Sequence, residues 1–209
     1  MALTLFVGSK RYSSWSLRPY LALAHTGAAF ETRTILLDRP TTAGEIAKVN
    51  PAGRVPVLHH DDLVVWDSLA ICEYVHELFP AAQLWPSERS RRARARAISA
   101  EMHAGFAALR LHMSMDLGAN RRGEGRAPEA LADAARIQTI WREELEASGG
   151  PFLFGSFTIA DAMYAPVTTR FVTYALELPP VLQRYVDAIA ALPAMQAWHR
   201  DAAAEPVSR

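Results

Sequence analysis

The sequence contains a single cysteine, Cys72, among its 209 residues. One thiol excludes an intrachain disulfide framework, and it also excludes the paired cysteines of CxxC redox and zinc motifs. Because Cys72 follows Ile71 on a predicted helix, we interpret it as a packed and unreactive thiol. This cysteine content is typical of a reduced compartment, and we expect a cytoplasmic protein.

An excess of charge of one sign is also absent, since 22 basic residues balance 22 acidic ones. This balance argues against a partner such as nucleic acid or a membrane surface. No apolar run approaches the length of a membrane span, and Met1-Ala2-Leu3-Thr4 lacks the basic segment of a signal peptide. Half of the residues are hydrophobic, which is enough for one large or two small domains with a packed core.

Residues 1–80 predict a compact α/β domain with the order β-α-β-α-β-β-α. From residue 87 onward the pattern is helical throughout, and residues 81–86 form a linker. We therefore expect an all-α domain over 87–209. Its helices are expected at about 88–117, 128–148, 158–176, 179–192 and 194–204.

A hydroxyl-rich turn, Tyr12-Ser13-Ser14-Trp15-Ser16-Leu17-Arg18, connects the first predicted strand to the first helix. Proline is tolerated in the first helical turn, so we expect Ser16 to cap the helix and Pro19 to be its third residue. Ser13 and Ser14 then lie beside the unpaired N–H groups at the positive end of the helix. The alternative is that all three serines serve only turn and capping hydrogen bonds.

Two other segments have features of a ligand site. Asp67-Ser68 begins a helix, where a carboxylate attracts an ammonium group and a helix N-terminus with a hydroxyl attracts a carboxylate. Ordinary capping is the alternative. A cis bond at Val55-Pro56 would offer the backbone of Val55 to an extended ligand, and a trans proline at the start of a strand is the alternative.

Together these features resemble the glutathione S-transferase family. The matching stretches are the serine turn, residues 50–58, residues 66–74 and the capping box Thr158-Ile159-Ala160-Asp161, and they cover nearly the whole chain in order. The resemblance implies a thioredoxin-like N-terminal domain, an all-α C-terminal domain, glutathione as cosubstrate, a homodimer and a role in detoxification. The serine turn is most similar to that of the zeta class, the maleylacetoacetate isomerases, which have Ser-Ser-Cys-Ser where this chain has Trp15 in place of the cysteine.

The resemblance implies that Ser13 or Ser14 donates a hydrogen bond to the glutathione sulfur. A free thiol with a pKa of about 8.5 is only a few per cent ionised at pH 7. A hydroxyl hydrogen bond to the thiolate contributes roughly 1.5–3 kcal/mol, which lowers the thiol pKa by one or two units. Serine thereby stabilises an anion whose proton goes to solvent. Tyr12 is a rival donor that we expect instead to form a pocket wall.

The resemblance also implies which residues hold the tripeptide. Val55 pairs with its cysteinyl backbone, and Asp67 and Ser68 hold its γ-glutamyl end. Arg54 is expected to help hold a carboxylate, and Trp15 either lines a pocket or packs in the core. The glutathione-binding residues are therefore expected to be Trp15, Arg54, Val55, Pro56, Asp67 and Ser68.

The helical domain is expected to supply a pocket for the second substrate, bounded by Tyr12, Phe106, Arg110 and Met113. The last three share one face of the predicted helix at spacings i, i+4 and i+7. An arginine on that face would recognise an anionic substrate, and methionine suits an adaptable apolar site. The alternative is that these residues fill the core.

The sequence thus predicts a glutathione transferase that activates the glutathione thiol for attack on an electrophilic small molecule. A glutathione-dependent cis-trans isomerase of the zeta type is an alternative. A non-catalytic glutathione-binding or scaffold protein is another. No metal is expected, because the adjacent side chains of His59-His60-Asp61-Asp62 point apart in a hairpin.

Overall fold

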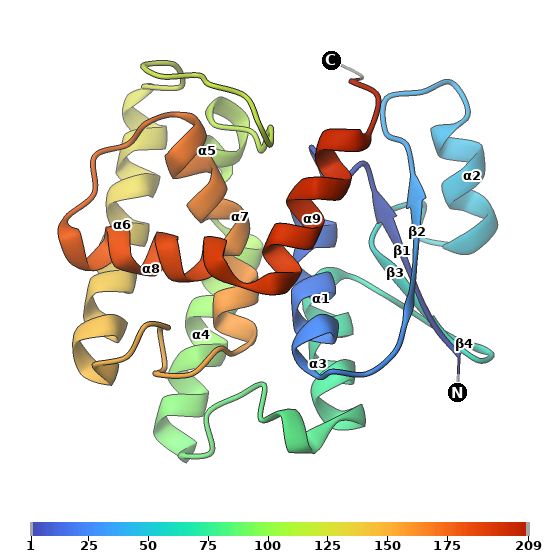
Figure 1. Cartoon of the computed structure of the whole chain (residues 1–209), viewed down its shortest axis with the longest axis horizontal. Helices are drawn as coiled ribbons and strands as arrows, with labels where there is room; N and C mark the ends of the chain where they lie inside the picture. Colours follow the sequence, from blue (N-terminus) through green and yellow to red (C-terminus); the bar gives the residue numbers. More distant parts are fainter. Residues whose placement is uncertain (1, 208–209) are drawn as a thin grey trace.

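The computed structural model describes residues 2–207. Its N-terminal part has the predicted β-α-β-α-β-β-α order and the thioredoxin-like arrangement implied by the resemblance (Figure 1). A 3-10 turn, Pro80–Ala82, follows the last helix of this domain. The elements are β1 (Leu3–Gly8), α1 (Ser14–His25), β2 (Glu31–Ile35), α2 (Thr42–Val49), β3 (Val57–His60), β4 (Leu63–Trp66) and α3 (Ser68–Leu78).

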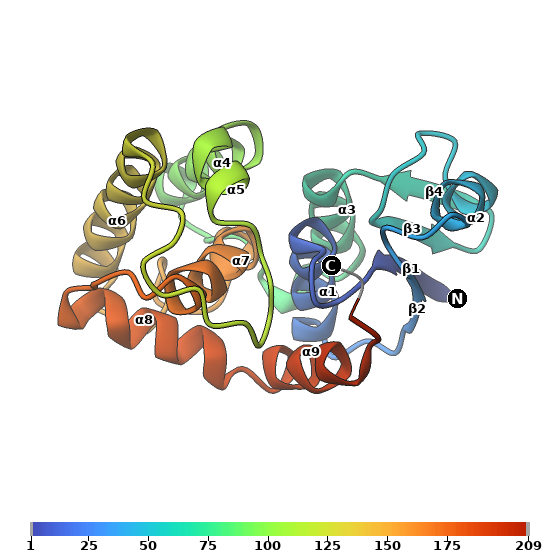
Figure 2. The same ribbon diagram turned by 90° about the horizontal axis from the view of Figure 1, so that it is seen from above.

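The four strands form one mixed sheet in the order β2-β1-β3-β4. β1 is parallel to β2, and it is antiparallel to β3, with Leu5 opposite Leu58. Successive side chains of a strand point to opposite faces. Leu5 therefore packs with the core that includes α1 and α3, whereas Phe6 packs with Ile46 of α2 on the other face. Figure 2 shows α1 and α3 between the sheet and the helical domain.

The C-terminal domain is helical, as predicted, and is built around α7. Nearly every residue of α7 is buried, and a helix that is buried all round belongs in the centre of a domain. α7 packs against α1 of the first domain and α4 of its own domain, so it joins the two. The helices are α4 (Arg89–Ala104), α5 (Ala107–His112), α6 (Pro128–Ser148), α7 (Ile159–Thr173), α8 (Pro180–Ala191) and α9 (Pro193–Ala204).

The single helix expected over 88–117 is wrong. α4 ends at Ala104, and α5 begins at Ala107 after Phe106, whose backbone is left-handed with φ 58°. A Cβ on Gly105 would lie 2.8 Å from the carbonyl oxygen of Glu101, so only glycine fits this close approach. The break means that Phe106 and Met113 lie at the two ends of α5 rather than on one continuous helical face.

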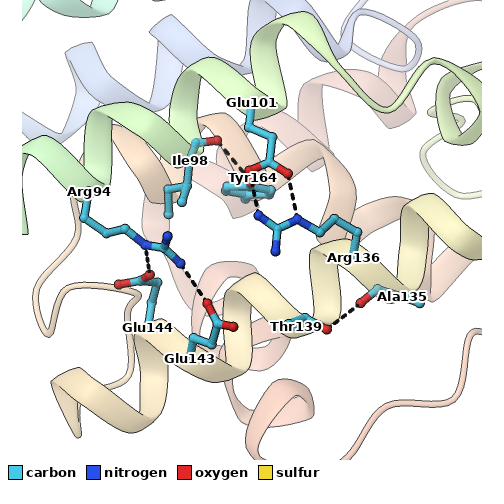
Figure 3. Close-up of polar contacts among 9 residues, drawn as sticks. All are labelled: Arg94, Ile98, Glu101, Ala135, Arg136, Thr139, Glu143, Glu144 and Tyr164. Carbon is cyan, nitrogen blue, oxygen red and sulfur yellow. Dashed lines mark hydrogen bonds and ion pairs between the residues drawn. The ribbon is translucent and has the colours of Figure 1, made fainter.

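Arginines on α4 and α6 are paired with carboxylates (Figure 3). Arg94 donates from Nε to Glu144 at 2.6 Å and from Nη2 to Glu143 at 2.8 Å. Arg136 makes two hydrogen bonds to the carboxylate of Glu101, at 2.8 and 3.0 Å. Such two-pronged pairs are the strong geometry for a guanidinium group. The charges of Arg94 and Arg136 are therefore neutralised locally.

The capping box at the start of α7 is present as predicted and is completely buried. Asp161 accepts hydrogen bonds from the N–H groups of Thr158 at 2.8 Å and Leu153 at 3.0 Å. Burial raises the pKa of Asp161 from its ordinary 3.8 to about 6, although these hydrogen bonds act in the opposite direction. The central helix thus depends on an ionisable group in the core.

The pH dependence of stability provides a test of this burial. Because the folded state holds the Asp161 proton more tightly than the unfolded state, the stabilising contribution is complete below about pH 4 and is lost as the pH rises through 6. We expect Asp161→Asn to be less stable at every pH, since it disturbs the buried N–H contacts. The difference in free energy of unfolding should narrow by up to about 3 kcal/mol between pH 4 and pH 7. Urea unfolding at a series of pH values measures it, and a constant difference would contradict the prediction.

Candidate active site

A cleft of about 240 Å³ lies where the loop before β3, the start of α3 and the end of α4 meet. It contains every residue that the resemblance assigned to glutathione binding. These residues were assigned from motifs that are separate in the sequence, and the fold brings the motifs together around one cleft. Four further lining residues had no such assignment, and His103 comes from the helical domain. The cleft is lined by Trp15, Asn50, Ala52, Arg54, Val55, Pro56, Trp66, Asp67, Ser68 and His103.

The peptide bond between Val55 and Pro56 is cis, as the resemblance implied. Buried Asn50 organises the loop before it: its Oδ1 accepts from the N–H of Ala52 at 2.9 Å, and its Nδ2 donates to the carbonyl oxygen of Arg54. These contacts satisfy backbone groups that would otherwise be unpaired. Asn50 therefore shapes the wall of the cleft.

Asp67 caps α3 and also contacts the helical domain. Its Oδ1 accepts from the N–H groups of Leu69 at 2.9 Å and Ala70 at 3.2 Å, so the capping alternative is present in the structure. Its Oδ2 lies 3.1 Å from Nε2 of His103. Ser68 is different, because its hydroxyl is buried and has no hydrogen-bond partner within residues 2–207. An unpaired buried hydroxyl costs free energy unless a ligand satisfies it.

The first helix begins earlier than expected. Ser13, not Ser16, is the N-cap residue, and Pro19 lies inside α1. The reason is that the Ser16 hydroxyl is used elsewhere: it accepts from the N–H of Gly8 at 3.0 Å and from the Ser13 hydroxyl at 2.7 Å. Ser16 thus ties the end of β1 to the first turn of α1, and the Ser13 proton is directed to Ser16.

The Ser14 hydroxyl has a different partner. Its Oγ accepts a hydrogen bond at 3.1 Å from Nη2 of Arg170, which comes from α7. Neither Ser13 nor Ser14 lines the cleft, and each is 6% exposed. Trp15, the next residue, does line it. The serine pair therefore immediately precedes a lining residue of the cleft in the sequence.

Three arginines gather around the serine turn without a salt bridge in residues 2–207, although the charge of Asp67 acts on Arg18 and that of Asp133 on Arg110. Arg18, Arg110 and Arg170, here called the arginine cluster, form no salt bridge within the described part of the chain, and all three nitrogens of the Arg18 guanidinium lack a hydrogen-bond partner there. The guanidinium carbons of Arg18 and Arg110 lie 4.3 and 4.5 Å from the centroid of the Trp15 ring, a cation–π distance.

The electrostatics of the arginine cluster follow from burial. Burial lowers the pKa of Arg18 well below its usual value, and the positive charges of Arg110 and Arg170 lower it further. Burial likewise lowers the pKa of Arg170 to about 10, again with a contribution from Arg110. A pKa of about 10 leaves Arg170 charged at neutral pH. The cluster therefore places positive charge behind the serine turn.

The four residues expected to form a second-substrate pocket are not brought together in the cleft. Phe106 and Tyr12 are buried, and Met113 is completely buried in the core. Of the four, Arg110 contacts the cleft through the ring of Trp15. Its guanidinium also donates to the carbonyl oxygen of Gly105 at 3.1 Å, at the break between α4 and α5. The location of the second-substrate pocket stays a prediction.

The C-terminal segment contacts the two residues that immediately precede the serine turn. The carboxylate of Glu205 accepts from the N–H groups of Lys10 at 2.9 Å and Arg11 at 3.3 Å. Trp198 of α9 donates from its indole N–H to the carbonyl oxygen of Lys10 at 2.8 Å, and Asp201 pairs with the Lys10 ammonium. These contacts span about 190 residues of sequence and were not predictable from any local pattern.

Two family models match this chain, the glutathione S-transferase N-terminal domain over residues 12–78 and the glutathione S-transferase C-terminal domain over residues 92–201. The chain belongs to the glutathione S-transferase family. It is 31% identical to a probable maleylacetoacetate isomerase of Caenorhabditis elegans over 90% of both chains, and 28% identical to maleylacetoacetate isomerase of Rattus norvegicus over 90% of this chain and 88% of that one.

A solved relative supports the assignment of the transferase fold. The structure of a glutathione transferase homologue from Burkholderia with bound glutathione is 26% identical, covers 98% of this chain and 100% of its own, and superposes with a TM-score of 0.77. No group of three or more metal-ligating side chains occurs in residues 2–207, and no helix there is long and apolar enough to cross a membrane.

The burial of Arg18 without a hydrogen-bond partner in residues 2–207 should affect the free energy of unfolding. A buried cation without a partner is destabilising, so we expect Arg18→Met to raise the free energy of unfolding by about 1–4 kcal/mol. The matched control is Arg94→Met, which removes an arginine paired with Glu143 and Glu144 and should lower stability. Urea unfolding measures both variants. A loss of stability in Arg18→Met equal to that of the control would contradict the assignment of Arg18 as uncompensated.

Proposed function

We propose that this chain is a glutathione transferase in which the cleft binds glutathione and the Ser14 hydroxyl stabilises its thiolate. The observation that carries the proposal is the arrangement of the serine pair: Ser13 directs its proton to Ser16, whereas Ser14 accepts from Arg170 and keeps its own proton for donation. Ser14 is thus the serine with a hydrogen bond to offer. The positive arginine cluster behind it favours an anion at the same place.

The mechanism needs no protein base. On binding, the S–H bond of glutathione breaks, its proton passes to solvent, and the thiolate accepts a hydrogen bond from Ser14. The thiolate then attacks an electrophilic carbon of the second substrate. The new carbon–sulfur bond forms as the bond to the leaving group, such as the halide of an aryl halide, breaks and the leaving group departs with its electron pair. A charge-assisted hydrogen bond of about 1.5–3 kcal/mol lowers the thiol pKa by one or two units, which makes thiolate a major form at neutral pH.

The remaining cleft residues suit the rest of the tripeptide. The backbone of Val55, before the cis proline, would pair with the cysteinyl unit. The unpartnered Ser68 hydroxyl and the N-terminus of α3 suit the γ-glutamyl carboxylate, and the Asp67 carboxylate suits its ammonium group. We assign Trp15 and Arg54 supporting contacts. In this proposal residues 1–80 bind glutathione, and residues 87–209 supply the second-substrate pocket.

A zeta-type cis-trans isomerase is the second candidate, supported by the similarity to the two maleylacetoacetate isomerases. In that reaction glutathione is regenerated instead of consumed. Product analysis with a maleyl-type diacid separates the two reactions, because only the isomerase returns all of the free thiol. Family membership further supports a cytosolic homodimer with a role in detoxification.

Replacing the two serines one at a time tests the mechanism. We expect Ser14→Ala to raise the pKa of bound glutathione by one or two units and to reduce kcat by about 10- to 100-fold, with little change in affinity. Ser13→Ala should change both quantities less, since its hydroxyl donates to Ser16. Thiolate absorbance in the ultraviolet and turnover with an aryl halide measure these effects.

Two outcomes would contradict this mechanism. If wild-type protein binds glutathione without lowering the thiol pKa, a non-catalytic binding or scaffold role is favoured. If Ser14→Ala leaves the thiol pKa unchanged, the assignment of Ser14 is wrong.

The unpaired Ser68 hydroxyl predicts a second effect. We expect Ser68→Ala to weaken glutathione binding about tenfold, the equivalent of one hydrogen bond to a charged group. Ser99→Ala is the matched control: its hydroxyl is also buried and without a partner within residues 2–207, but Ser99 does not line the cleft. Calorimetric titration measures both affinities. Equal affinities of the two variants would exclude Ser68 from the site.

A further inference from the structure

Arg170 stands out because it joins the helical domain to the serine turn. It lies on α7, it is 3% exposed, and its one hydrogen bond to a side chain within the described residues goes from Nη2 to the Ser14 Oγ at 3.1 Å. Its Nε and Nη1 atoms have no hydrogen-bond partner there. Burying a guanidinium group costs free energy, and a single side-chain hydrogen bond to a neutral hydroxyl does not offset that cost. The contribution of Arg170 to stability therefore does not explain its position.

The contact constrains the direction of the Ser14 proton. A guanidinium group has only donors, so Ser14 can act toward Arg170 only as an acceptor. One lone pair of the Oγ is then occupied, and the O–H must point to a different partner. Ser13 has no such constraint from an arginine, because its contact is with the hydroxyl of Ser16. The difference between the serines therefore originates in α7.

The charges around Arg170 indicate which kind of ligand would bind beside its guanidinium group. Some arginines of the helical domain are paired with carboxylates, as Arg94 and Arg136 show (Figure 3), and others, such as Arg126, donate to backbone carbonyl oxygens. Arg170 instead lies near two further cations, Arg110 and Arg18, and the charge of Arg110 acts directly on it. No salt bridge neutralises the three cations within residues 2–207. Positive charge at this place favours the binding of an anion beside the serine turn.

We infer that Arg170 is a positioning residue, which fixes the Ser14 hydroxyl so that its proton is donated to the glutathione sulfur. The inference rests on the proposed function and adds to it a dependence of thiol activation on the helical domain. Ser14 keeps its proton throughout, Arg170 keeps its own, and the proton released from the thiol goes to solvent. Arg170 acts through Ser14 and does not itself touch the reacting sulfur.

A double-mutant cycle tests this chain of action. Arg170→Met, Ser14→Ala and the double variant are prepared in the full-length protein, and the pKa of bound glutathione is measured from its thiolate absorbance. We expect Arg170→Met alone to raise the thiol pKa by about one unit, a tenfold loss of thiolate at a pH well below it. In the double variant it should add little to the effect of Ser14→Ala, since the residue through which it acts is gone.

Three comparisons keep a structural effect separate from positioning. S-methylglutathione has no ionisable thiol, so Arg170→Met should bind it as the wild type does. Arg170→Lys keeps a positive charge and a group with N–H donors, and it should recover part of the thiol pKa shift. It also serves as the test variant if Arg170→Met does not fold. Arg142→Met removes an exposed arginine from α6 and should leave the thiol pKa unchanged.

The outcomes distinguish the inference from the proposed function. A wild-type protein that does not lower the thiol pKa overturns the proposed function itself. If the wild type lowers it but the two substitutions are additive, Arg170 acts as a distant charge and the positioning inference is wrong, while the transferase assignment stands. An unchanged thiol pKa in Arg170→Met would also overturn the inference.

Discussion

Positive charge that no salt bridge neutralises within residues 2–207 lies beside the serine turn, and the rest of the site depends on this constraint. Burying one guanidinium group without a carboxylate costs several kcal/mol, and Arg18 and Arg170 are both buried with their cationic neighbour Arg110 close by. The ring of Trp15 offsets part of this cost by contacting Arg18 and Arg110. Positive charge of this kind next to two serines favours the binding of an anion at the serine turn.

The charge of the arginine cluster can stabilise a bound anion only if the serine turn is fixed in position. Contacts from three separate parts of the fold fix the turn. The end of β1 is tied through Gly8 to Ser16, α7 reaches Ser14 through Arg170, and the C-terminal segment holds the backbone of Lys10 through Glu205. Each contact satisfies a polar group on one side of the turn. Rigid support of this kind is what a preorganised hydrogen-bond donor requires, because no energy is then spent on reorientation when the anion forms.

The sequence predicted the order of the elements in the N-terminal domain, because that order follows from local patterns. The resemblance assigned six of the residues that line the cleft, and four more had no assignment. Alternating apolar residues define the strands, Pro and Gly mark the breaks, and Asp67-Ser68 and Val55-Pro56 lie in recognisable motifs. The predictions from sequence were wrong where a group distant in the sequence determines the local conformation. Ser16 was expected to cap α1, but Gly8 and Ser13 use its hydroxyl. The break at Gly105 depends on how closely Glu101 approaches, which periodicity does not reveal.

The division of roles between Ser13 and Ser14 is the clearest case of information that no local pattern carries. The two residues are adjacent, equally buried and chemically identical, so the sequence left both as candidates. What separates them is a side chain 156 positions away on a helix of the other domain. α7 is buried nearly all round, and its position is set by packing against α1 and α4. In the proposed mechanism, the packing of the helical domain therefore decides which of two identical hydroxyls serves an anion, because α7 carries the arginine that contacts Ser14.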